Sequence, residues 1–160
     1  MNNLKTQINL LLIIFFLQNL LLIPIFSAEK LKEKQYLTFQ ISGFSDNAGQ
    51  GLLLLFKKGN KVPTSPWLIR SFIIRNKQSE TALSIPYGEY AAIIVHDKNS
   101  NGKIDHKFGL PNEPLGFTNY WKINLFSGKP TFKKLKFNFS KEKSVIRITV
   151  KDKIKTFFRH

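Results

Sequence analysis

The sequence contains no cysteine, which excludes a disulfide framework, a thiol nucleophile and a thiolate metal site. It also lacks the G-x-S-x-G elbow, the phosphate-binding loop and the H-E-x-x-H helix that mark common catalytic sites. Asp105 and Glu113 could form a carboxylate pair of the glycosidase kind, but no further feature of such a site accompanies them. We therefore expect the protein not to be an enzyme.

Histidine is scarce too, with three in the whole chain. His96 ends an apolar run and precedes Asp97, where it could serve as a base or a ligand. A single histidine at a strand end is more often a hydrogen-bonded structural residue. The sequence leaves both roles open and favours the structural one.

Acidic side chains are few: 10 Asp and Glu stand against 25 Lys and Arg, a formal charge of +15. Residues 122–160 alone carry 12 basic and 2 acidic side chains. An anionic surface or a glycan is therefore a physically sound partner. The basic residues are mostly dispersed singly between apolar ones, which favours compositional drift over a dedicated binding surface. We expect no nucleic-acid partner.

Residues 1–28 have the composition of a signal peptide. Lys5 gives a sparse positive start, Ile8 to Leu17 is an apolar core, and Phe26-Ser27-Ala28 ends in small residues that suit cleavage. The alternative is an uncleaved anchor, because apolar character continues to Phe26. We expect an exported protein, periplasmic or extracellular, whose mature chain begins near Glu29. The absence of cysteine excludes the bacterial lipid attachment that is made to a cysteine side chain.

Residues 29–160 predict a single all-β domain, an antiparallel sandwich of about seven strands that follows an N-terminal signal helix. Short segments with strand patterns are separated by turn residues, and no helical periodicity follows residue 28. The expected strands are 37–41, 52–56, 72–74, 79–85, 89–96, 131–139 and 144–150.

Two of these strands, 52–56 and 91–95, are apolar without interruption, and such strands need cover on both faces. One face should meet the opposite sheet. We expect the long segment that follows His96 to be ordered and to cover the other face. Its candidate covering residues are Phe108, Leu110, Pro111, Leu115, Phe117, Tyr120 and Trp121.

The same segment holds the candidate site, a run of oxygen-bearing side chains between residues 97 and 113. Their spacing matches the start of an EF-hand calcium loop, with Asp97, Asn99, Asn101, Lys103 and Asp105 at positions 1, 3, 5, 7 and 9 and a glycine at position 6. Position 12, where that motif has a bidentate glutamate, is a phenylalanine, so Glu113 would have to fold back as the substitute. The competing interpretation is a tight Asn-Gly turn in a polar loop. Calcium is the one cofactor that the sequence suggests.

These residues give the chain a resemblance to the exported bacterial family catalogued as domain of unknown function 2141. The matching phrases are Gly88-Glu89-Tyr90-Ala91, His96-Asp97-x-Asn99-x-Asn101-Gly102-Lys103-x-Asp105, Gly109-x-Pro111-x-Glu113, Gly116-Phe117-x-Asn119 and Pro130-x-Phe132. The resemblance implies a secreted or periplasmic sandwich, similar to prealbumin-like and carboxypeptidase regulatory domains, with no established activity. The all-β sandwich that the strand pattern predicts is of the prealbumin-like or Ig-like kind. The chain departs from the family pattern at Lys133 and Lys134, where acidic and small residues are expected.

Two functions are compatible with the sequence. The first is a non-catalytic exported module whose loop 97–113 binds calcium and presents a surface to an envelope partner. The second is a basic protein that binds an envelope surface or a glycan through its Lys- and Arg-rich C-terminal strands and the tail 154–160. The dependence on ionic strength distinguishes the two functions. An interaction of the basic surface weakens as the salt concentration rises, whereas a loop held by buried carboxylates does not.

Overall fold

The computed structural model describes residues 35–107, 110–123 and 127–151. The chain divides into two units, Met1–Lys32 and Glu33–His160, and every described residue belongs to the second. The predicted signal peptide and the tail 154–160 lie outside the described residues. Across the described ranges, no helix has both the length and the apolar character needed to span a membrane.

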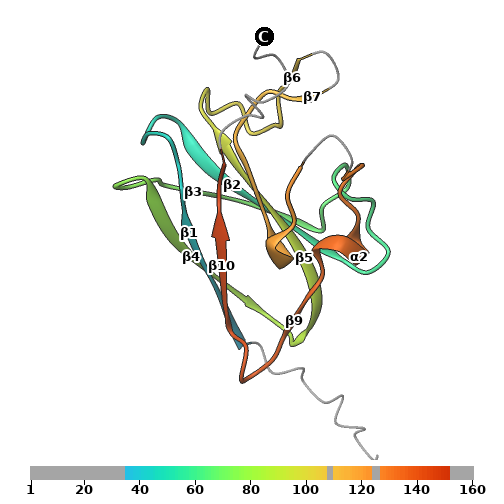
Figure 1. Cartoon of the computed structure of the whole chain (residues 1–160). Coiled ribbons are helices and arrows are strands. Elements are labelled where there is room, and N and C mark those ends of the chain that lie inside the picture. Colours follow the sequence, from blue (N-terminus) through green and yellow to red (C-terminus); the bar gives the residue numbers. More distant parts are fainter. Residues whose placement is uncertain (1–34, 108–109, 124–126, 152–160) are drawn as a thin grey trace, which may run out of the picture. The chain divides into compact units, whose positions relative to one another are not determined.

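The described chain forms a two-sheet sandwich, which confirms the predicted all-β fold (Figure 1). One sheet has the order β10-β1-β4. The other has the order β3-β2-β5-β8, and β9 also pairs with β5. A small third sheet joins β6 and β7. The strands are β1 (Gln35–Ser42), β2 (Gln50–Lys57), β3 (Leu68–Phe72), β4 (Gln78–Ile85), β5 (Gly88–Asp97), β6 (His106–Lys107), β7 (Leu110–Pro111), β8 (Leu115–Phe117), β9 (Phe137–Phe139) and β10 (Val145–Thr149).

One pairing is parallel: β10 runs alongside β1 from Thr38↔Val145 to Ser42↔Thr149. The cause is the route of the chain. β9 ends beside the start of β5, and the turn that follows leads to the start of β1, where the Thr38 N–H donates to the Ser144 carbonyl at 2.8 Å. The last strand therefore enters the first sheet in the direction of β1, and that sheet is mixed.

The strands β2 and β5 are buried on both faces, as their sequences predict. Alternate residues of each strand enter either an inner cluster between the two sheets or an outer cluster on the far side. The inner cluster includes Leu53, Leu55, Ala92 and Ile94 of these strands. The outer cluster contains Leu52, Leu54, Phe56, Ala91, Ile93 and Val95, covered by Phe117 and Leu135.

The cover of the outer cluster comes largely from the segment expected to provide it. Leu115, Phe117 and Trp121 pack there, so the segment is ordered and packed. Tyr120 is 89% exposed and takes no part in the cover, contrary to expectation. Phe108 and the side chain of Leu110 lie outside the described residues.

Two expected strands are wrong in position. The strand expected at 72–74 lies upstream as β3, because the chain leaves the sheet after Phe72. The strand expected at 131–139 is divided between a single helical turn, α2 (Phe132–Leu135), and β9. The Thr131 side chain caps that turn by accepting the Lys134 N–H, and the turn directs Phe132 and Leu135 onto the outer cluster. In Figure 1, α2 lies beside β5 on the side away from β10.

Thr118 fills a gap in the sheet. Along one edge of β5, β9 pairs with residues 88–90 and β8 with residues 93–95, and neither strand reaches Ala92. Thr118 begins the 3-10 turn η1 (Thr118–Tyr120), and the residue is 1% exposed. Its oxygen accepts the Ala92 N–H at 3.0 Å and donates to the Leu135 carbonyl at 2.6 Å. One hydroxyl thus joins β5, η1 and α2.

Candidate functional site: the loop 97–113

The candidate loop begins where β5 ends, and the strand fixes the direction of its first residues. His96 follows Tyr90, Ala92 and Ile94 on the inner face, whereas Asp97 lies on the opposite face. Both side chains are 0% exposed. A buried carboxylate at this point requires hydrogen-bond donors.

Three donors surround the Asp97 carboxylate. One oxygen accepts the Asn101 N–H at 3.1 Å, and the other accepts the Gly102 N–H at 2.8 Å and the Gln50 side-chain amide at 2.8 Å. Gly102 has a φ of 75°, which a glycine adopts without strain. The backbone from 97 to 102 therefore curls around this carboxylate, as the spacing of the residues predicts.

A second carboxylate closes the curl. The amide groups of Asn99 and Asn101 donate to the two oxygens of Asp105 at 2.7 and 2.9 Å. The Asn101 side-chain oxygen accepts the Lys103 N–H at 2.8 Å. Rotation of either amide by half a turn would present an oxygen in place of its NH₂ group toward Asp105.

Glu113 folds back against the loop, as its position at the far end requires. Its carboxylate accepts the Asp105 N–H at 3.2 Å and a backbone N–H from Lys98, and the residue is 7% exposed. Burial raises the pKa of this carboxyl, and the negative charges of Asp97 and Asp105 raise it further. The recorded ion pairs among the described residues involve Asp46 and Glu89, and none includes the three acids of this loop.

The structure thus brings all six predicted site residues into one hydrogen-bonded loop: Asp97, Asn99, Asn101, Lys103, Asp105 and Glu113. Within the described ranges, no group of three or more His, Cys, Asp or Glu side chains is arranged to hold a metal ion. Any ion would have to draw on amide and carbonyl oxygens as well as on the carboxylates. Calcium binding at this loop stays a prediction.

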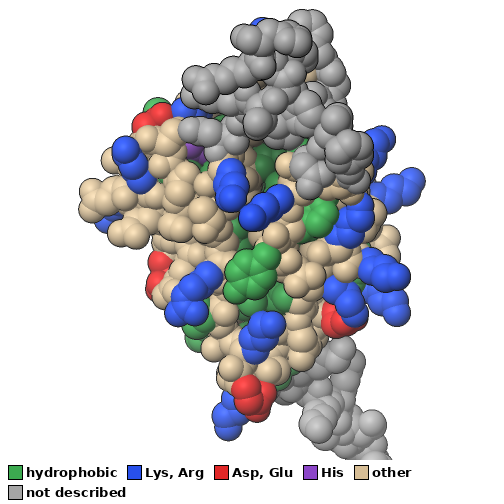
Figure 2. Space-filling view, in the orientation of Figure 1, with side chains coloured by type: hydrophobic (Ala, Val, Ile, Leu, Met, Phe, Trp, Pro, Cys, Tyr) green, Lys and Arg blue, Asp and Glu red, His purple; other side chains and the backbone are tan. Residues whose placement is uncertain are grey.

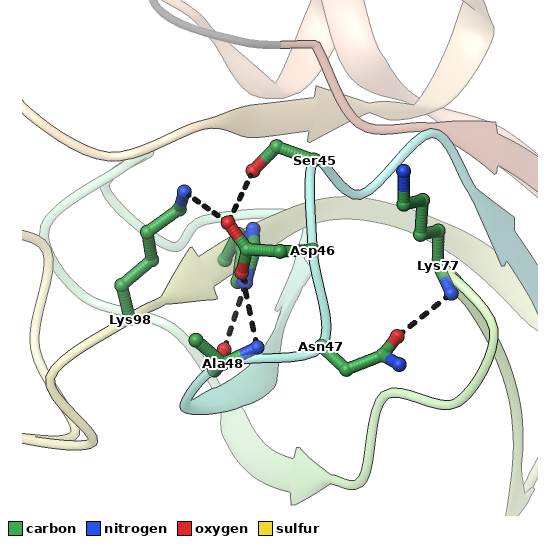
Figure 3. Close-up of polar contacts among 7 residues, drawn as sticks. Ser45, Asp46, Asn47, Ala48, Lys77 and Lys98 are labelled. Carbon is green, nitrogen blue, oxygen red and sulfur yellow. Dashed lines mark hydrogen bonds and ion pairs between the residues drawn. The ribbon is translucent and has the colours of Figure 1, made fainter.

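The neighbouring loop between β1 and β2 supports the same strand end (Figure 3). Asp46 accepts hydrogen bonds from Lys98 at 2.7 Å, from the Ala48 N–H at 3.0 Å and from Ser45 at 3.2 Å. The Lys98 ammonium, followed by the Ala48 N–H, lowers the pKa of Asp46 to about 2. Asp46 and Lys98 therefore link the two loops.

His96 belongs to this junction. Its Nε2 lies 2.9 Å from the Ala48 carbonyl oxygen and 3.5 Å from an Asp46 oxygen, and its ring packs edge-on against Phe44. Both neighbours of Nε2 are acceptors, so Nε2 carries the proton. Nδ1 is buried without a partner among the described residues. This geometry supports the structural role.

Sequence reasoning missed the residues that hold the loop from outside. Gln50 donates to Asp97 from 47 positions earlier in the chain. Gly49 allows the chain just before β2 to lie against the end of β5, because a Cβ at this position would lie 2.1 Å from the Asp97 carbonyl oxygen. The signal in the sequence was weak: a polar residue and a glycine at the start of an apolar strand.

The family described as "Uncharacterized protein conserved in bacteria (DUF2141)" matches residues 39–147. The chain belongs to this family. The match runs from β1 to β10 and includes the whole candidate loop. No curated protein and no solved structure gives a significant match.

Several residues behind the DUF2141 resemblance have structural roles. A Cβ on Gly116 would lie 2.7 Å from Ile148, so the glycine lets β8 approach β10. Asn119 adopts a φ of 57° and donates to the Lys134 carbonyl at 3.1 Å. Lys134, one of the two departures from the family pattern, donates its ammonium to the Ser127 and Lys129 carbonyls at 2.6 and 3.1 Å. Asn119 and Lys134 thus hold the segments around η1 and α2, which cover the outer cluster, whereas Gly116 lies against Ile148 of the inner cluster.

Proposed function

We propose that the protein is an exported, non-catalytic β-sandwich module whose loop 97–113 binds calcium and presents a rigid surface to an envelope partner. The observation that carries the proposal is the grouping of Asp97, Asp105 and Glu113 on one loop, two of them buried, without an ion pair to any of them among those recorded. Calcium prefers carboxylate, amide and carbonyl oxygens, which this loop supplies.

The geometry also indicates how an ion would be held. The two Asn amides now donate to Asp105, so they take the place that a cation would take beside that carboxylate. Rotation of both amides would turn two neutral oxygens toward the same point. An ion there would offset the repulsion between Glu113 and its acidic neighbours.

The affinity should be low. Three lysines in or beside the loop, Lys98, Lys103 and Lys107, reduce its negative electrostatic potential. Position 12 of the calcium-loop pattern also lacks an acid. The extracellular affinity class, with a Kd of about 10⁻⁴ to 10⁻³ M, fits such a site. At about 2 mM free ion and the tighter limit, linkage adds roughly 1.8 kcal/mol to the free energy of unfolding. For a domain of this size the melting temperature rises by about 7 °C.

Thermal unfolding with and without 2 mM calcium tests the proposal. Glu113→Gln keeps an acceptor for the Asp105 N–H but removes one charge, so the calcium-dependent rise in Tm should fall to less than half. Glu142→Gln is the matched control, because Glu142 is exposed, lies outside the loop 97–113, and its carboxylate accepts a hydrogen bond from Ser140 at 2.8 Å. Equal calcium shifts in wild type and both variants would mean that the ion acts nonspecifically and that the loop is only a turn.

A second candidate function is binding of an anionic envelope surface or glycan. Figure 2 shows Lys and Arg side chains spread over the displayed face, with few Asp and Glu among them. Lys133 and Arg147 are exposed and make no recorded ion pair, whereas Lys136 is engaged with Glu89 at 2.6 Å. The basic tail that belongs to this candidate lies outside the described residues.

Vesicle binding tests the lipid form of this candidate. Vesicles with about 30% anionic lipid should retain the protein at 20 mM salt and release most of it near 150 mM, because screening weakens exposed charge contacts. Vesicles of neutral lipid should retain none. Equal retention by both kinds of vesicle, or by neither, would remove the electrostatic explanation.

A further inference from the structure

A groove of about 970 Å³ lies on the outer face of the sheet β10-β1-β4, bounded by the segment from Ser71 to Asn76. Its volume is near the upper end of the roughly 300–1,000 Å³ that ligand sites occupy. The calcium-loop residues take no part in its lining. The groove is therefore a separate feature of the fold.

The floor of the groove consists of polar side chains in two rows across three strands. Arg147, Gln40 and Glu80 are register partners on β10, β1 and β4, so their side chains share one face. Thr149, Ser42 and Gln78 form the next row in the same way. Neighbouring strands are about 4.8 Å apart, so each row presents three polar groups over about 10 Å.

The groups along this floor differ in charge. Arg147 and Arg75 bring guanidinium groups to the groove, and neither makes a recorded side-chain hydrogen bond or ion pair with the described residues. Glu80 is the acid of the lining, and it accepts a hydrogen bond from Gln40 at 3.1 Å. Ile73, which is 69% exposed, adds an apolar surface at the side.

We propose that this groove binds an acidic oligosaccharide, a chain of sugars that carry carboxylates. Guanidinium groups bind carboxylates through paired hydrogen bonds. Sugar hydroxyls can donate to Glu80 and exchange hydrogen bonds with Gln40 and Ser42. The C–H face of a sugar ring can pack on Ile73. The proposal narrows the second candidate function, on which it rests, to one site and one ligand class.

Other anions fit this groove less well. A bare inorganic anion would gain from the two arginines but would be repelled by Glu80, and it would leave most of the floor unused. A single-stranded nucleic acid needs exposed aromatic rings for its bases to stack on. The aromatic residue of the lining is Phe72, and it is half-buried and packed against the inner cluster.

Titration calorimetry with tetragalacturonate at 20 mM salt, where screening is weak, tests the proposal, with maltotetraose as the neutral probe of similar size. Arg75→Gln combined with Arg147→Gln should weaken the binding of tetragalacturonate at least tenfold. Arg70→Gln combined with Lys141→Gln removes the same charge from exposed positions outside the lining, and should weaken it less than threefold. Maltotetraose should bind wild type at least tenfold more weakly than tetragalacturonate. Thermal unfolding of each variant checks that it is folded.

The outcomes separate the groove from the general basic surface. Equal losses in the two double variants would overturn the groove and leave the second candidate function standing. No binding of tetragalacturonate to wild type would overturn the groove and the glycan form of that candidate together. Equal affinity for an oligonucleotide of the same charge would show that charge alone is recognised, which also overturns the assignment.

Discussion

Replacement of Thr118 by valine should destabilise the fold far more than the loss of one hydroxyl suggests. Valine has nearly the same shape, so packing is retained. The Ala92 N–H and the Leu135 carbonyl would each lose the partner that the hydroxyl supplies. A buried polar group left unsatisfied costs about 1–3 kcal/mol. With two such groups we expect a loss of about 2–6 kcal/mol in the free energy of unfolding, or a fall in Tm of about 8–22 °C.

Urea denaturation measured by tryptophan fluorescence gives the free energy, and differential scanning calorimetry gives the Tm. Thr149→Val is the matched control, because Thr149 is exposed on β10 and makes no recorded side-chain hydrogen bond. That control should change stability by no more than about 0.5 kcal/mol. If the two variants behave alike, the hydroxyl of Thr118 is not the joint between β5, η1 and α2, and the reasoning is refuted.

Two further predictions concern acid stability and export. Asp46 has a pKa of about 2 in the folded protein, below its ordinary value of 3.8, because it accepts hydrogen bonds from Lys98 and Ala48. Its contribution to stability is therefore present above about pH 4 and is lost as the pH falls through 2. Asp46→Asn should therefore be less stable than wild type at pH 7, and the difference should vanish near pH 2 in acid-unfolding curves; a constant difference would contradict the prediction. Amino-terminal sequencing of the native protein should give a start within a few residues of Glu29. Recovery of an intact Met1 in a membrane fraction would instead indicate an uncleaved anchor.

Local patterns predicted those parts of the fold in which local and tertiary preferences agree. The alternation of Leu37, Phe39 and Ile41 corresponds to β1, and all three residues are buried in the inner cluster. The same rule failed at Leu135, which lies two positions before Phe137 and four before Phe139, but three positions after Phe132. A short apolar run fits both periods, and the Thr131 cap and the outer cluster decide for a helical turn.

Edge strands and contacts between residues far apart in the sequence were harder to predict. β3 has three exposed residues in succession, including Ile69 and Arg70, so it carries no alternating signal. The candidate loop was predictable because its residues lie close together in sequence and shape one another through local hydrogen bonds. The donor from Gln50 and the polar rows of the groove depend on strand register, which no local pattern specifies.

The parallel pairing of β1 with β10 has a consequence for how the chain reaches its folded state. It joins segments roughly 100 residues apart, and a closure of that length carries a large entropic cost before any contact repays it. Until the last strand is available, Leu37, Phe39 and Ile41 lack the side chains of Ile146 and Ile148 beside them. Folding to completion must therefore wait for the carboxyl-terminal strand, and a chain threaded through a translocation channel from its amino terminus would remain open almost until its end emerged.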